Sequence, residues 1–184
     1  IVQGDIPSAG TLWVTANDTA NAGAVPAGGA GQTWNYASLN NIEQDTTIFL
    51  AASGTPYAAQ FPGSNLAGFS SGGYTYFTSG PTGLFANGSI DPSSGFVITF
   101  NPARLIFPVP FTYGNSLTHI SKFQYDTTLS SIDYRFVQYT EQGFNADGYG
   151  SLQLPTGTYS STLRVKETDL GIDSIYINMG PLGW

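Results

Sequence analysis

The sequence predicts an all-β protein: an antiparallel β-sandwich of the jelly-roll or immunoglobulin-like type, with about ten short strands in a single domain over residues 1–184. No stretch places apolar residues at positions i, i+3, i+4 and i+7 over three turns, as an amphipathic helix requires. Instead, 23 glycines and 11 prolines interrupt the chain every few residues. The runs between them are rich in Thr, Tyr, Phe, Val and Ile, which favour the half-buried surface of a pleated sheet. A chain of this length should bury about 70% of its unfolded surface, enough for one substantial core.

The first two thirds of the chain contain short runs of β-branched and aromatic residues, separated by residues that favour turns. Residues 20–31 consist mostly of Ala and Gly, which are too small to build a core, so we expect a loop there. The runs predict strands at Thr11–Ala16, Gln32–Tyr36, Thr46–Ala51, Tyr74–Thr78, Phe96–Phe100, Leu105–Phe107 and Thr118–Tyr125.

Alternation of apolar and polar residues is clearest in the last third. It predicts a strand at Ile132–Gln142 and another at Gly148–Leu154. The intervening Asn145–Gly148 combines Asn, Asp and Gly, so the two strands are expected to form a hairpin. Two more strands are predicted at Thr158–Glu167 and Ser174–Met179.

Charge is scarce and unevenly distributed. Only 9% of residues are Asp, Glu, Lys or Arg, against about 25% in ordinary soluble domains. Residues 1–103 contain no Lys or Arg, Arg104 is the first base, and the whole chain carries a net charge of −7. Nucleic acids and anionic membrane surfaces are bound by clustered Lys and Arg, so we predict neither partner. No apolar run reaches 18 residues, so membrane insertion is not expected.

Uncharged polar groups must keep such a surface in solution. The chain has 18 Ser and 20 Thr, and it has no Cys, which rules out disulfides and thiolate metal sites. Hydroxyl-rich, charge-poor composition is typical of extracellular proteins. We therefore expect a location outside the cell or on its surface, the sequence being a mature protein without its signal peptide or an excised piece.

A histidine and a serine motif each suggest catalysis, but each lacks the partner residues or the local structure that catalysis would need. His119 is the only histidine, whereas a catalytic or metal-bound imidazole needs partners, so we interpret it as structural. Gly68–Gly72 matches the G-x-S-x-G pattern of hydrolases around Ser70, yet a turn into a strand follows where that motif needs a helix.

Paired carboxylates offer a second route to catalysis. Glu43 with Asp45, and Glu167 with Asp169, would each lie on one face of a strand about 6.5–7 Å apart. Inverting glycosidases use carboxyl groups at about that separation. Nothing in the sequence places an aromatic-lined cleft beside either pair, so we interpret them as solvated acids. We predict no enzyme, no cofactor and no metal site.

Aspartate followed by a hydroxyl residue recurs along the chain. The pattern Asp, then Thr or Ser, then a small or apolar residue occurs four times among nine aspartates. It resembles the O-glycosylation acceptor motif of proteins exported by Bacteroidota. On this resemblance the predicted acceptors are Thr19, Thr46, Thr127 and Ser174.

Four segments, in order, resemble the N-terminal β-domain of Bacteroidota surface proteins exported by the type IX secretion system. They are Gly29–Tyr36, Gly54–Pro62, Phe107–Gly114 and Asp147–Tyr159 with its continuation Leu163–Lys166. The resemblance implies export across both membranes and carries over no catalytic residue. Such proteins end in a sorting domain, which on this resemblance was cleaved after export or lies outside this sequence.

These observations predict a secreted structural or adhesive protein of the cell surface. It would associate with itself or with other surface proteins, and could form a filament through strand addition at Ile1–Ala16 and Ser174–Trp184. The alternative is a non-catalytic carbohydrate-binding module, with Trp13, Trp34, Trp184 or the 11 tyrosines as stacking platforms. A glycosidase or esterase is the third reading.

Overall fold

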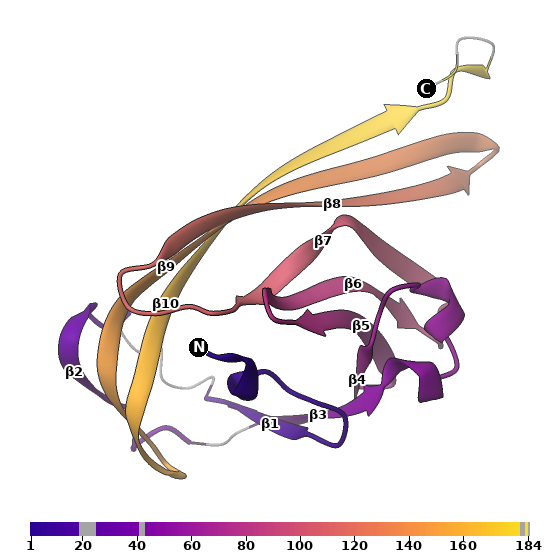
Figure 1. Cartoon of the computed structure of the whole chain (residues 1–184). Coiled ribbons are helices and arrows are strands. Elements are labelled where there is room, and N and C mark those ends of the chain that lie inside the picture. The colour runs from indigo at the N-terminus through magenta and orange to yellow at the C-terminus, as the bar shows by residue number, and fades with distance from the viewer. Residues whose placement is uncertain (19–24, 41–42, 181–182, 184) are drawn as a thin grey trace.

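The structure, a computed structural model, describes residues 1–18, 25–40, 43–180 and 183. It confirms the all-β class, with ten strands in an open, mostly antiparallel sheet (Figure 1). None of the helices in the described ranges is long and apolar enough to span a membrane. The strands are β1 (Leu12–Asn17), β2 (Gly29–Asn35), β3 (Glu43–Ala51), β4 (Leu66–Ser70), β5 (Gly73–Gly80), β6 (Gly83–Asp91), β7 (Phe96–Pro108), β8 (Ser116–Leu129), β9 (Ile132–Leu154) and β10 (Gly157–Ile177). Three short 3-10 helices are η1 (Gln3–Asp5), η2 (Ala52–Gly54) and η3 (Ala58–Gln60).

The strands divide into two sheets that meet at β7. Antiparallel pairing runs in the order β1-β3-β4-β5-β6-β7-β8-β9-β10, so almost every strand pairs with its neighbour in the chain. We call β1 and β3–β7 the body sheet, and β8–β10 the arm sheet. The ladder between β7 and β8 consists of a single pair, Phe100 with Phe123. The two sheets are therefore joined at one point of the backbone ladder.

The predicted hairpin around Asn145–Gly148 is wrong, because β9 runs through this segment without turning. The register against β10 shifts here instead: Arg164 pairs with Gly148, whereas Val165 pairs with Ala146. Asp147 is the extra residue, and its carboxylate accepts a hydrogen bond of 2.5 Å from Arg164. The Asn, Asp and Gly that indicated a turn thus accommodate a β-bulge.

Other strands differ from prediction in length. The segments predicted as Phe96–Phe100 and Leu105–Phe107 merge into β7, and those predicted as Thr158–Glu167 and Ser174–Met179 merge into β10. Strands β4 and β6 were not predicted, because glycine and other small residues break up their apolar pattern.

Three groups of buried side chains form the core. One, around Phe49, Phe77 and Leu84, lies on one face of the body sheet. A second contains Ala67, Tyr76 and Ile90 from the opposite face, together with Ala52 and Phe61 from the η2–η3 segment. The third joins Leu105 and Phe111 to Phe144 and Ala146 of β9, and so packs the arm sheet against the body.

The side chain of Gln142 reinforces this junction. Gln142 is fully buried in β9 and faces Leu105 of β7. Its amide oxygen accepts a hydrogen bond from the Leu105 N–H at 3.2 Å, and its amide nitrogen donates to the Leu105 carbonyl at 3.0 Å. The same nitrogen donates to Glu167 at 3.0 Å. Gln142 therefore supplies Leu105 with the donor and acceptor that a neighbouring strand would otherwise provide.

Strand β2 pairs in parallel with the stretch Gly148–Gln153 of β9. This stretch lies just beyond Ile132–Asn145, the part of β9 that pairs with β8. The two backbones approach closely at Gly150, where a Cβ atom would lie 1.9 Å from the carbonyl oxygen of Gln32. Trp34 of β2 is buried, and its indole N–H donates to the Ala27 carbonyl at 3.0 Å. Glycine at position 150 is thus required for β2 to dock.

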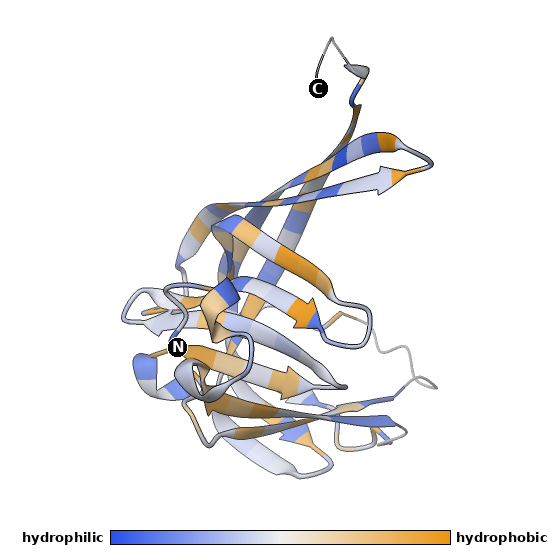
Figure 2. Ribbon diagram, turned by 90° about the vertical axis from the view of Figure 1, so that its right-hand side faces the viewer, coloured by the Kyte–Doolittle hydropathy of each residue, from blue (hydrophilic) through white to orange (hydrophobic). Residues whose placement is uncertain are grey.

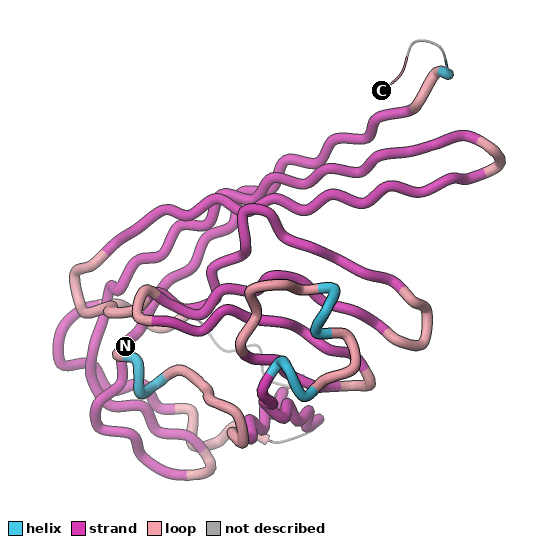
Figure 3. Tube along the Cα trace, turned by 45° about the vertical axis from the view of Figure 1, so that its right-hand side comes forward, coloured by secondary structure: helices cyan, strands magenta, loops and turns pink. Residues whose placement is uncertain are grey.

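The arm sheet extends past the body. The β8–β9 hairpin and the C-terminal half of β10 project together beyond the other strands (Figures 1 and 3). We call residues 124–136 and Ile172–Ile177 the distal arm. Hydrophobic and hydrophilic residues alternate along it out to its tip (Figure 2). One face of the distal arm consequently carries apolar side chains such as Leu129, Ile132 and Ile175, and the other carries Asp126, Asp133 and Arg135.

Candidate functional site

The two ends of the strand order are open edges. Strand β10 pairs only with β9, and β1 pairs only with β3, within the described part of the chain. The open edge of β10 is 21 residues long. Long, apolar edge strands present unpaired N–H and C=O groups that readily pair with another strand. Both edges are therefore candidate sites of strand addition.

An exposed apolar cluster lies on the arm sheet, on the face away from β7. It consists of Ile120, Tyr139, Leu170 and Ile172, which we call the arm patch; these side chains are between 45% and 64% exposed. Tyr139 pairs across the strands with Ile172, and Glu141 pairs with both Ile120 and Leu170. Glu141 thus separates Ile120 from Leu170, whereas Tyr139 and Ile172 are direct neighbours; exposed apolar side chains grouped on one face in this way indicate an interaction surface.

The distal arm has one exposed apolar face, opposite to the face that carries the arm patch. Leu129 and Ile132 form a cross-strand pair beside the hairpin turn, and both are exposed. Ile175 and Ile177 of β10 are exposed on the same face. Three strands need a covered hydrophobic face to be stable by themselves. Tyr125 on this face packs against Phe96 of β7, whereas these four side chains are between 43% and 63% exposed. This uncovered part of the distal arm is the feature that most requires a partner.

A second exposed apolar cluster lies at the opposite end of the strand order. Leu12 and Val14 of β1 share one face with Ile48 and Leu50 of β3, and we call these four residues the β1 patch. Their side chains are between 37% and 58% exposed. Strand β1 contains no charged residue. The protein thus has two separate apolar clusters, each adjoining an open edge.

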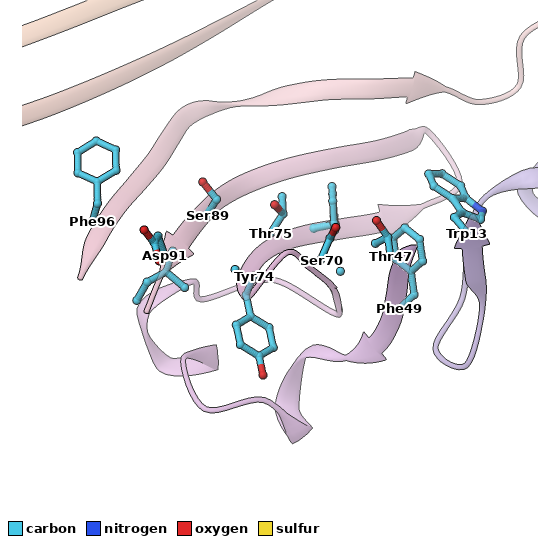
Figure 4. Close-up of a pocket in the computed structure, with 13 residues that line it drawn as sticks. Trp13, Thr47, Phe49, Ser70, Tyr74, Thr75, Ser89, Asp91 and Phe96 are labelled. Carbon is cyan, nitrogen blue, oxygen red and sulfur yellow. The ribbon is translucent and has the colours of Figure 1, made fainter. Parts of the chain in front are cut away.

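A groove crosses the opposite face of the body sheet from β1 to β7, with a volume of about 340 Å³. Trp13 lies at one end of the groove and Phe96 at the other, with a row of hydroxyl side chains between them (Figure 4). Strand pairing fixes this row, because Trp13 pairs with Thr47 and Thr75 pairs with Ser89. Gly68 in the middle keeps the groove open, since a Cβ atom there would lie 3.1 Å from the Thr47 methyl group. The hydroxyl row is Thr47, Ser70, Thr75 and Ser89.

Asp91 lines this groove, and a second carboxylate, Asp45, is hydrogen-bonded to its Ser70. Asp45 accepts hydrogen bonds from Ser70 (2.8 Å), Ser71 (3.3 Å) and the Thr46 N–H (2.8 Å). The bond from Ser70, followed by that from the Thr46 N–H, lowers the Asp45 pKa. Asp91 is bound by the side chains of Ser93 and Ser94 and by the Ser93 N–H, which lower its pKa to about 2. Both groups are therefore ionised at neutral pH.

The Asp91 carboxylate should make the β6–β7 turn sensitive to acid. Because its folded pKa of about 2 lies below the ordinary value of 3.8, its stabilising contribution is present above pH 3.8 and is lost as the pH falls towards 2. We expect the difference in Tm between the wild type and Asp91→Ala to narrow over this interval, as measured by thermal unfolding. A difference that stays constant from pH 5 to 2 would contradict this role.

The structure separates the candidate catalytic residues. Ser70 donates to Asp45, whereas the His119 ring is hydrogen-bonded to the Ala103 carbonyl at 2.7 Å and contacts Phe85 edge-on. Ser71 and Gly72 form the tight turn after Ser70, both with positive φ, so no helix follows this serine. Among the described residues, no three His, Asp or Glu side chains gather as metal ligands do.

The carboxylate pairs behave differently from each other. Glu43 and Asp45 both lie in β3 and are exposed, and Asp45 is held as described above. Glu167 and Asp169 both form ion pairs with Arg104, and Glu167 also accepts the hydrogen bond from Gln142. The second pair therefore stabilises the junction between the sheets.

The predicted glycosylation sites lie in strands where the structure describes them. Thr46 is exposed in β3, while Thr127 in β8 and Ser174 in β10 are partly exposed; Thr19 lies outside the described residues. The aspartate before each described site has a structural partner: Ser70 for Asp45, Arg135 for Asp126 and Gln138 for Asp173. Glycosylation at these positions stays a prediction.

Several functional residues were not predicted from the sequence. Gln142 lies in a strand where polar and apolar residues alternate, and the sequence gives no sign that this glutamine is buried rather than exposed to solvent. The hydroxyl row comes from four strands, so only the pairing brings it together. Of the predicted stacking aromatics, Trp13 reaches the groove, Trp34 is buried, and Trp184 lies outside the described residues.

Comparisons with protein-family models, with curated proteins and with solved structures find no match to this chain.

Proposed function

We propose that this chain is a secreted structural or adhesive protein of a cell surface, which assembles head to tail into filaments. The open edge of β10 on the distal arm joins the open edge of β1 on the next copy. The observation that carries this proposal is the projecting distal arm, which has an exposed apolar face and is unpaired along β10 within the described part of the chain. The charge-poor, hydroxyl-rich composition supports a location outside the cell.

The two edges suit each other in length and charge. The part of β10 in the distal arm, Ile172–Ile177, is six residues long, as is β1. Asp173 is the one charged residue in this part of β10, so two β10 strands paired together here would bring two carboxylates into one ladder. Since β1 has no charge, a ladder of β10 with β1 opposes no like charges in any register. A contact between unlike surfaces leaves one free edge of each kind at the two ends of every oligomer, so it generates an open filament unless its rotation closes a ring.

Blocking either edge should abolish assembly. We expect the wild type to form filaments visible by electron microscopy, because each copy offers both edges. Lysines on an edge strand prevent strand addition. The variant Ile172→Lys/Ile175→Lys and the variant Leu12→Lys/Val14→Lys should therefore each remain monomeric in light scattering.

Mixing the two blocked variants tests the head-to-tail arrangement. Each retains the edge that the other has lost, so a 1:1 mixture should form a dimer and nothing larger. A control with lysines at two exposed positions elsewhere, Val2→Lys/Val25→Lys, should still form filaments. A mixture that stays monomeric, or a wild type that is monomeric at high concentration, would overturn the proposal.

A further inference from the structure

We propose that the groove across the body sheet binds a neutral oligosaccharide. This site lies on the Trp13 face, whereas the β1 patch lies on the other face of the same strands. The proposal concerns a ligand rather than a second copy, and it holds whether or not the protein forms filaments.

The hydroxyl row matches a polyol. Thr47, Thr75 and Ser89 are partly exposed in the groove. Their hydroxyl groups form no hydrogen bond with the described part of the chain, whereas that of Ser70 donates to Asp45. Each hydroxyl can donate one hydrogen bond and accept two, and so can each sugar hydroxyl. The three free hydroxyls therefore offer both roles to a chain of sugar rings.

The ends of the groove supply aromatic surface. Trp13 is held edge-on by Phe49 at 4.8 Å and by Phe107 at 6.1 Å between ring centroids. Phe96 is 39% exposed and is held edge-on by Tyr125 of β8 at 4.9 Å. Rings fixed in this way offer apolar contact area without further loss of side-chain entropy on binding. Neighbouring strands lie about 4.8 Å apart, so the five intervals from β1 to β7 give a groove about 24 Å long.

Charge narrows the class of ligand. No Lys or Arg lines the groove, and the sequence has none in residues 1–103. The ionised carboxylate of Asp91 lies in the groove. The ionised carboxylate of Asp45 accepts a hydrogen bond from Ser70, which lines the groove. Phosphorylated, sulfated and uronic-acid sugars would meet repulsion without any compensating cation. A neutral sugar chain is the polyhydroxyl ligand that this lining accommodates.

Binding can be measured with neutral tetrasaccharides. We would titrate the protein with cellotetraose, mannotetraose and laminaritetraose, and follow amide chemical shifts by NMR. Shifts should occur at Thr47, Thr75 and Ser89 with at least one of them. Tetragalacturonate, the acidic counterpart, should cause none. If no neutral tetrasaccharide shifts these amides at millimolar concentration, or if tetragalacturonate does so, the proposal is wrong.

Isosteric variants test the hydroxyls without altering the fold. Thr47→Val/Thr75→Val removes two hydroxyl groups and should weaken binding about 5- to 150-fold, because each lost hydrogen bond is worth about 0.5–1.5 kcal/mol. Thr46→Val is the matched control, since Thr46 precedes Thr47 in β3 and faces the other side of the sheet. Equal affinity in the double variant and the control would refute the site. The same titration on Leu12→Lys/Val14→Lys separates this result from assembly, because binding should persist in the monomer.

Discussion

Replacing Gln142 with methionine should lower the free energy of unfolding by about 2–5 kcal/mol, although the side chains have similar size. Gln142 provides both hydrogen-bonding partners of the buried Leu105 backbone. The apolar side chain would leave that N–H and that C=O unpaired in the interior, and each orphaned group costs about 1–3 kcal/mol. Urea unfolding measures the loss, and hydrogen exchange at the Leu105 amide shows where it originates.

The matched control is Gln138→Met in the same strand. Gln138 also donates to a carboxylate, Asp173 at 2.8 Å, but this bond is exposed and water can replace it. We expect a change within about 0.5 kcal/mol there, as for most surface substitutions. Similar losses in the two variants would show that Gln142 does not join the sheets.

Phe49→Ala should destabilise the body sheet by about 3–5 kcal/mol, the usual cost of deleting a buried phenylalanine side chain. Phe49 is 2% exposed and contacts Trp13 edge-on on one side and Phe77 on the other, with centroids 4.8 and 6.1 Å away. The deletion would remove these contacts from the core group that also contains Leu84 and Val109. Thermal and urea unfolding give the loss directly.

Leu50→Ala serves as the control for this substitution. Leu50 follows Phe49 in β3 but faces the other side, where it is 37% exposed in the β1 patch. Its loss should cost about 1–2 kcal/mol, less than that of Phe49, because more than a third of the Leu50 side chain already contacts water. If Phe49→Ala costs no more than Leu50→Ala, the core is not where the burial pattern places it.

The sequence predicted the fold class because alternation with period two survives in almost every strand. Strand ends were less predictable, since a β-bulge and a turn use the same residues. Asn145–Gly148 shows this: Asp147 is tied to Arg164 and Ala146 is fully buried, so the chain continues straight. Conversely, the real turn after β8 is Ser130–Ser131, both with positive φ, and has no glycine to reveal it.

The candidate sites were less predictable than the fold for a related reason. Alternation indicates which residues share a face, but it does not indicate which face is covered. Val137 and Ile172 both lie on the outer face of the arm sheet, yet Val137 is 6% exposed and Ile172 is 61% exposed. The groove depends on registers across six strands, which no local pattern encodes. The predicted secretion-system resemblance and surface location stay predictions.

The pairing of β2 with β9 sets the order in which the protein can fold. Every other ladder except that of β1 with β3 joins strands consecutive in the chain, so each can form as soon as its two strands meet. Strand β2 instead pairs with Gly148–Gln153, far along the chain, and its ladder runs parallel. Such distant contacts form slowly, because a long loop must close first. Docking of β2 at Gly150 is therefore expected to be the last step, which leaves that side of β9 as an additional unpaired edge until folding is complete.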